Sequence, residues 1–270
     1  MHRLILVIFL IVGIIFSVYL VLQNTSLFSK ASPDIAPKNV TVSNISDSSI
    51  TLSWVTDKET IGFVKYAEDA SLNQTEYDER DENGPKMRNT HFVVLKNLTT
   101  QKKYYFKIVS QDQVFGDGEK PFEQLTASIS EDTPPVPVLT FGKLKKIDGN
   151  IPKEAVIYLK LPNSTPITTY TEDEGNYLLT VTNARKADLS SYLEVKDGDE
   201  ATIWADGGLD GSLSNTQIKI NSSKAMEDLI LEEPVNPAQV AEDNTLRDFN
   251  NDGLINAHDF AIMIKRILKL

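Results

Sequence analysis

The stretch Ile50-Thr51-Leu52-Ser53-Trp54 decides the fold class, because apolar residues alternate in it with small polar ones. In a β-strand, successive side chains point to opposite faces, so Ile50, Leu52 and Trp54 fall on one face. Similar short runs recur from about residue 33 to residue 231, with turn-rich segments between them. Strands at such regular spacing are typical of β-sandwiches and not of folds that alternate strands with helices. We therefore expect a mainly β protein.

A proline cluster divides this β region in two. Residues 131–137 read Glu-Asp-Thr-Pro-Pro-Val-Pro, and prolines in such number make a stiff, extended spacer. We predict one sandwich over residues 32–129 and a second over residues 130–233, in tandem. The segments 1–31 and 234–270 lie outside both predicted sandwiches.

Further strands are expected in the first sandwich at residues 62–66, 91–95 and 104–108. Leu98 precedes Tyr104 by six residues, which is the pattern of the tyrosine corner of Greek-key sandwiches.

Three short motifs accompany these strands: Trp54-Val55-Thr56, Val64-Lys65-Tyr66 and His91-Phe92-Val93-Val94-Leu95. Together, the strands and motifs resemble a fibronectin type III domain. The variant is similar to the N-terminal domain that precedes the catalytic domain of purple acid phosphatases. The phosphatase metal centre belongs to a separate domain and needs several histidines, whereas this chain has three. We expect His91, which sits in a strand pattern, to pack or be exposed and not to bind metal.

The second predicted sandwich contains strand-like runs at residues 139–147, 155–159 and 170–181, the last one interrupted by an acidic glycine turn. The order Gly142, Ala155-Val156, then Thr171-x-Asp173-x-Gly175-x-Tyr177 resembles carboxypeptidase-regulatory-like and collagen-adhesin B-type domains. The resemblance implies a transthyretin-like sandwich of the kind used as a stalk module on bacterial surfaces. The segment 206–211 is acidic and rich in glycine but lacks a ligand register, so we expect a hairpin turn there.

The N-terminus contains an apolar segment, Leu4–Leu22, interrupted only by Gly13 and Ser17. Nineteen helical residues span about 28 Å, close to the thickness of a bilayer's hydrocarbon core. No Ala-x-Ala cleavage pattern follows Leu22, so we favour an uncleaved anchor over a cleaved signal peptide. His2 and Arg3 precede the segment, which favours the N-terminus inside and the bulk of the chain outside the cell.

The C-terminus carries the pattern of a calcium loop, Asp-Phe-Asn-Asn-Asp-Gly-Leu-Ile-Asn-Ala-His-Asp, over residues 248–259. Oxygen-bearing side chains stand at positions one, three, five, nine and twelve, and a glycine stands at position six, where the loop must turn sharply. A hard cation such as Ca²⁺ takes six to eight oxygen ligands, and this spacing presents them from one loop. The predicted ligands are Asp248, Asn250, Asp252, Asn256 and Asp259 by side chain, with Asn256 direct or through water, and Leu254 by its carbonyl oxygen.

The segments that flank this loop differ from those of an ordinary EF-hand. Prolines at 234 and 237 disfavour an entering helix. On the exit side an apolar stripe at helical spacing predicts a helix, and it comprises Phe260, Met263, Ile264, Ile267 and Leu268. Loop and exit helix resemble a single type I dockerin repeat, which implies docking to a cohesin-like partner. Dockerins normally carry two repeats, and this chain shows one.

Composition excludes several functions. There are no cysteines, so neither disulfides nor thiolate metal sites can form. The net charge of −11 makes nucleic acid a poor partner. No nucleophile elbow, phosphate-binding loop or His-Glu-x-x-His motif occurs, so we expect no enzyme.

Three function classes remain. The first is a non-catalytic, membrane-anchored surface protein that docks or assembles through its calcium tail, with self-association as one form of assembly. The second is a carbohydrate-binding or wall-binding module, for which Trp204 is a candidate exposed aromatic. The third is an accessory subunit of a secreted polysaccharide hydrolase or phosphatase.

Overall fold

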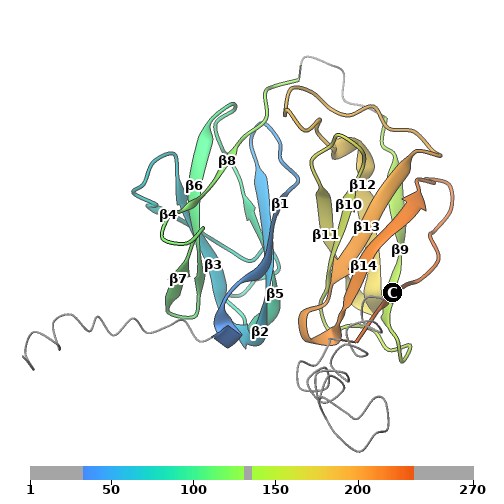
Figure 1. The fold of residues 1–270 in the computed structure, drawn as a ribbon, viewed down its shortest axis with the longest axis horizontal. Coiled ribbons are helices and arrows are strands. Elements are labelled where there is room, and N and C mark those ends of the chain that lie inside the picture. The colour runs from blue at the N-terminus through green and yellow to red at the C-terminus, as the bar shows by residue number, and fades with distance from the viewer. Residues whose placement is uncertain (1–32, 131–135, 234–270) are drawn as a thin grey trace, which may run out of the picture.

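The computed structural model describes residues 33–130 and 136–233, which form two β-sandwiches standing side by side (Figure 1). In these two ranges the regular structure is β apart from short 3-10 turns, and they include no helix long and apolar enough to cross a membrane. The predicted anchor, Leu4–Leu22, and the predicted calcium ligands of residues 248–259 lie outside the described residues. The prediction of a mainly β protein is confirmed.

The first sandwich consists of two antiparallel sheets. One has the order β1-β2-β5, and the other has the order β4-β3-β6, with β7 and β8 both pairing β6 along its length. The strands are β1 (Lys38–Ser43), β2 (Ile50–Thr60), β3 (Gly62–Ala67), β4 (Gln74–Tyr77), β5 (Arg88–Leu95), β6 (Lys103–Ser110), β7 (Gln113–Phe115) and β8 (Phe122–Leu125), preceded by the turn η1 (Pro33–Ile35).

The core of this sandwich is built as the alternation predicts. Ile50, Leu52 and Trp54 point inward and are fully buried. The tyrosine corner is also present, because the Tyr104 hydroxyl accepts the backbone N–H of Thr99 at 2.9 Å. A tyrosine held in this way fixes the connection that leads into β6.

The second sandwich pairs a four-stranded sheet, β11-β10-β13-β14, with a three-stranded one, β12-β9-β15, in which β15 runs parallel to β9. Its strands are β9 (Leu139–Lys146), β10 (Val156–Lys160), β11 (Ile167–Tyr170), β12 (Asn176–Thr180), β13 (Glu200–Asp206), β14 (Ser212–Lys219) and β15 (Leu229–Leu231). The 3-10 turns are η2 (Asp173–Gly175), η3 (Val181–Asn183) and η4 (Gly208–Asp210). The turn expected at residues 206–211 is η4, between β13 and β14.

Two residues of the sequence motif quoted for the second sandwich, Gly142 and Tyr177, lie in contact. Tyr177 on β12 pairs directly with Gly142 on β9. A Cβ added to Gly142 would lie 3.0 Å from the Tyr177 hydroxyl oxygen, so the ring occupies the space that a side chain would need.

The two sandwiches pack sheet against sheet. The sheet β1-β2-β5 of the first faces the sheet β11-β10-β13-β14 of the second, which makes a stack of four layers (Figure 1). Val156 and Tyr158 on β10 turn outward to meet Phe92 on β5, while Ile157 and Leu159 turn inward to the core of the second sandwich. We call this contact the interdomain face. The succession of two sandwiches along the sequence does not by itself reveal this arrangement.

Both ends of the described body lie at the same end of the stack. The turns η1 and η4 both contact β2, and Gly208 of η4 lies beside Asn89 at the start of β5. Glu232, close to the C-terminal end of the described residues, exchanges backbone hydrogen bonds with Ser212, just beyond η4. Pro33 and Glu233, the first and last described residues, therefore both lie at this end.

Candidate functional site

The interdomain face is the candidate functional region of the described residues. At the centre of the interdomain face, the side chains on both faces of strand β2 are buried. Thr51 and Ser53 point away from the core of the first sandwich and are 2% and 0% exposed. The Ser53 hydroxyl is 2.9 Å from the Tyr158 hydroxyl, a hydrogen bond between the two sandwiches in a fully buried setting. Burial raises the pKa of Tyr158 well above its ordinary value, against the effect of the Ser53 bond, so the phenol stays protonated.

Aromatic rings surround this hydrogen bond. Phe92 meets Tyr170 edge-on with ring centroids 5.1 Å apart. Tyr158 and Trp204, directly opposite on β10 and β13, stack at 5.1 Å with an interplanar angle of 8°. Such rings bury much apolar surface in defined orientations, which stabilises the contact and fixes its geometry.

Asn44 joins the two sandwiches through the edge of strand β11. Its side-chain nitrogen donates to the Thr168 carbonyl at 2.9 Å, and its side-chain oxygen accepts the Thr168 N–H at 2.9 Å. Its backbone N–H also donates to the Pro166 carbonyl at 3.0 Å. An amide side chain thus takes the place of a neighbouring strand and satisfies backbone groups on the edge of β11. The positive φ of 46° that this needs is one that asparagine tolerates better than most residues.

A loop of the second sandwich reaches into the core of the first. Leu189 belongs to the first sandwich's apolar cluster, although it comes from the loop after η3. Ser128 ties down this loop by donating its hydroxyl to the Ser190 carbonyl at 2.6 Å. Nearby, the buried Arg185 lies over the ring of Tyr192 at 3.8 Å and reaches Asp47 of the first sandwich at 3.7 Å.

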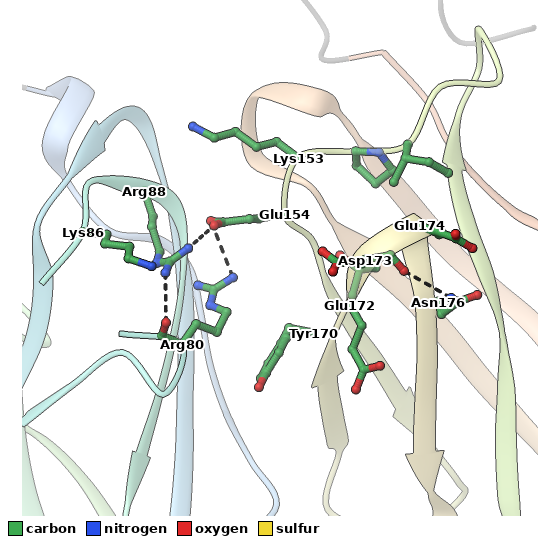
Figure 2. Close-up of a pocket in the computed structure, with 13 residues that line it drawn as sticks. Arg80, Lys86, Arg88, Lys153, Glu154, Tyr170, Glu172, Asp173, Glu174 and Asn176 are labelled. Atoms are coloured by element: carbon green, nitrogen blue, oxygen red, sulfur yellow. Dashed lines mark hydrogen bonds and ion pairs between the residues drawn. The ribbon is translucent and has the colours of Figure 1, made fainter. Parts of the chain in front are cut away.

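A cleft opens at one margin of the interdomain face (Figure 2). Arg80, Lys86 and Arg88 line one wall, and an acidic turn around η2 lines the other. Glu154 comes from the second sandwich and pairs with both Arg80 and Arg88 of the first. The full lining is Arg80, Lys86, Arg88, Ile151, Pro152, Lys153, Glu154, Tyr170, Thr171, Glu172, Asp173, Glu174 and Asn176.

The two arginines of this cleft are already paired with carboxylates. Arg80 makes two bonds of 2.7 Å to Asp78, and Arg88 lies 3.0 Å from Asp81. Burial tends to raise the pKa of Asp78, but the hydrogen bonds and charge of Arg80 outweigh it and lower that pKa. Because both guanidinium groups are matched by carboxylates, and Glu154 is shared between them, this part of the cleft acts as a clamp between the sandwiches.

The residues singled out in the sequence have distinct positions. Trp54 is a core residue, fully buried. His91 is 1% exposed, stacks on Trp54 at 4.8 Å and bonds Thr60 at 3.1 Å. Burial lowers the pKa of His91 to about 4, so it is neutral at physiological pH. Gly62 permits this packing, since a Cβ there would lie 2.4 Å from the His91 ring.

Trp204 is half-buried at the rim of the interdomain face, and the candidate sugar site is taken up below. Residues 33–130 and 136–233 contain no group of three or more histidine, cysteine or acidic side chains able to hold a metal.

Sequence reasoning missed the residues that join the sandwiches, above all Asn44, Glu154 and Leu189. One signal was available. Residues 51–56 of strand β2 read Thr-Leu-Ser-Trp-Val-Thr, and the outer face of the strand carries no charge until Asp57. An outer face free of charge over that length is typical of a surface that another element covers.

Comparison with known proteins supports the resemblance predicted for the first sandwich. Residues 37–124 match the family model described as "Purple acid Phosphatase, N-terminal domain". The predicted resemblance over this part is confirmed, and the match covers about a third of the chain. Among solved structures, one match is the "Crystal structure of chicken CNTN1 FN1-FN3 domains", at 10% identity and a TM-score of 0.26, covering 71% of this chain and 67% of that one. No curated protein matches the chain.

Proposed function

We propose that this chain is a non-catalytic surface protein, anchored in a membrane by Leu4–Leu22 with its bulk outside the cell. Its two sandwiches serve as one rigid body, and its C-terminal loop binds Ca²⁺ and docks to a partner. The observation that carries the proposal is the interdomain face, where aromatic packing, a buried hydrogen bond and a charge clamp join the sandwiches. A body joined in this way keeps its own first and last described residues at a fixed distance from each other.

For the second sandwich we propose the transthyretin-like, carboxypeptidase-regulatory type. The pairing of Gly142 with Tyr177 supports it, because residues of the quoted motif then serve one packing contact. A module of this type adds spacing and rigidity to a surface protein and needs no catalytic site.

The position of the described ends adds a detail to this proposal. The first and last described residues, Pro33 and Glu233, lie at the same end of the body. The partner of the calcium tail in this proposal is a cohesin-like or other protein of the same envelope.

Calcium calorimetry tests the docking part of the proposal. Calcium is titrated into a fragment of residues 32–270, and one binding site is expected, with a gain in helicity by circular dichroism. Asp252→Ala is expected to abolish the binding, because it removes a central carboxylate ligand of the predicted loop.

Asp210→Ala provides the matched control. Asp210 is also an aspartate in a glycine-rich acidic segment, but its carboxylate lies 3.5 Å from Lys146 and accepts the Lys153 N–H at 2.6 Å. Calcium binding should be unchanged in this variant. Absence of binding up to millimolar calcium in the unaltered fragment would remove the calcium-dependent docking function.

A further inference from the structure

A second hollow between the sandwiches lies on the other side of the aromatic cluster, beside Trp204. We call it the Trp204 groove, and its volume is about 510 Å³. Strand β1 of the first sandwich forms one wall, and strands β13 and β14 of the second form the other. It is lined by Asn39, Val40, Thr41, Tyr158, Trp204, Ala205, Asp206, Ser212, Leu213, Ser214 and Asn215.

The chemistry of this lining differs from that of the arginine cleft. The groove holds one aromatic platform, several amide and hydroxyl groups, one carboxylate and no basic residue. The volume of the groove lies in the range of small-molecule sites, and its mainly polar lining suits a ligand rich in hydroxyl groups. The lack of a cation, together with a net charge of −11, disfavours anionic ligands.

Trp204 is held as a platform. Tyr158 covers one face of the indole, so the opposite face is the one on which a ligand can stack. The face of an aromatic ring carries partial negative charge and attracts the weakly positive C–H groups of an apolar surface. A pyranose ring has such a C–H face and, at its edge, hydroxyl groups that need hydrogen-bond partners.

Asp206 supplies those partners from a fixed position. Its side chain belongs to a residue that is 8% exposed. One carboxylate oxygen accepts from Asn39 at 2.7 Å, and the other accepts from the Gly208 N–H at 3.0 Å. Each oxygen retains a lone pair for a further donor. Because the carboxylate is already oriented, a ligand that binds it does not have to order it first.

Asn39 brings the first sandwich into the site. It lies at an irregularity of β1, where the pairing with β2 shifts between Lys38 and Thr41, and it has a φ of 52°. This bulge directs the amide across the interdomain face to Asp206. The groove is therefore complete only when the two sandwiches are docked.

From these observations we propose that the Trp204 groove binds a neutral pyranose unit of a polysaccharide. The sugar ring stacks on Trp204, and its hydroxyl groups bind Asp206 and the polar side chains of β14. This site is separate from the calcium tail and does not depend on the function proposed for it.

The test uses the full-length chain in a polyoxyethylene detergent, since sugar-headed detergents would compete for the groove. EDTA is present throughout, so that calcium binding at the C-terminal loop cannot contribute. Cellohexaose, xylohexaose, mannohexaose and chitohexaose are titrated separately, with calorimetry and tryptophan fluorescence as readouts. The chain has two tryptophans, and Trp54 is fully buried, so a change in emission on binding reports on Trp204.

We expect at least one of the four probes to bind with saturation and to change the emission. Trp204→Ala should weaken that binding about tenfold or more. Trp204→Phe keeps a ring against Tyr158 and should remove the emission change while weakening the calorimetric signal. Tyr77→Ala, which alters an exposed aromatic on β4 far from the groove, should leave binding unchanged.

Ser214→Lys tests the groove without altering the aromatic stack, and it decides the matter if Trp204→Ala does not fold. A long side chain at this lining position should block the probe. Failure of all four probes to bind up to about 10 mM would overturn the proposal. Binding that persists at full strength in both Trp204→Phe and Ser214→Lys would place the sugar elsewhere on the chain and would overturn it equally.

Discussion

A double-mutant cycle on Ser53 and Tyr158 tests the contact at the centre of the interdomain face. Ser53→Ala removes one partner of a 2.9 Å hydrogen bond and leaves the Tyr158 hydroxyl facing a methyl group. Tyr158→Phe does the reverse and leaves the Ser53 hydroxyl in a setting where it is 0% exposed. A buried polar group that loses its partner costs about 1–3 kcal/mol, so each single variant should lower the free energy of unfolding by that amount.

The double variant should be much less destabilised than the sum of the two. Both polar groups are then absent, and replacing both partners by apolar groups of similar shape is close to neutral. We expect a coupling energy of about 1 kcal/mol or more between the two positions.

Urea unfolding of residues 33–233, followed by circular dichroism, measures these values. The cycle has particular force because the two residues are 105 positions apart in the sequence and belong to different sandwiches. A stable chain with additive effects, within about 0.3 kcal/mol, would show that the two hydroxyl groups do not meet and would refute the docking of the sheets.

Three further predictions concern the same body. Glu154→Gln should destabilise residues 33–233 by about 1–3 kcal/mol in urea, because the buried Arg88 and the part-buried Arg80 lose a shared carboxylate. Glu172→Gln, an exposed acid of the same cleft, should change stability by less than about 0.5 kcal/mol, and equal effects would contradict the clamp. Asn44→Gly should lower stability by about 1–3 kcal/mol through the unpaired Thr168 backbone groups. Asn44→Ala should cost about 1 kcal/mol more because of its left-handed φ, and a wild-type stability for either variant would argue against the edge contact. As pH falls, the His91 imidazole of the unfolded state becomes protonated near pH 6.5. In the folded state, its lowered pKa means that protonation occurs only near pH 4. Unfolding free energy should therefore fall by about 3 kcal/mol as pH decreases through that window. His91→Gln should flatten this part of the pH profile, and an unchanged slope would show that His91 is not buried as a neutral ring.

The sequence predicted the elements with strong patterns. The alternation in Ile50–Trp54 placed three side chains in the core, and the spacing of Leu98 and Tyr104 predicted a corner that the structure contains. These features are local, because a strand period and a turn contact depend on residues close in the chain. Short strands such as β4 and β7 carry too few residues to show a period, and they were missed.

The docking of the two sandwiches could not be predicted in the same way. The bond between Ser53 and Tyr158, and the pairing of Asn44 with Thr168, join residues far apart in sequence. A serine on the outer face of a strand can face either solvent or a buried partner. The sequence pattern of the strand is the same in both cases, so it does not reveal the contact. In the sequence, nothing distinguishes Glu154 from the other acidic residues of the chain. Its role becomes clear only in the structure, where it pairs with Arg80 and Arg88.

The candidate sites also differ in whether their residues are close together in the sequence. The calcium loop could be predicted because its proposed ligands come from one stretch of twelve residues, 248–259. The Trp204 groove could be predicted only in part from the sequence. Trp204 stood out as an aromatic on an alternating strand, but Asn39 and Asp206 became its neighbours only through the docking of the sandwiches.

Small-angle X-ray scattering of residues 33–233 tests the central claim, which is that the two sandwiches form one side-by-side body. A compact chain of this length should have a radius of gyration of about 17 Å. Two separate sandwiches of about 13 Å each, joined end to end with centres about 40 Å apart, would give about 24 Å. A value near the first is the expected result. A value near the second, with the elongated distance distribution of two beads, would contradict the interdomain face and every site that depends on it.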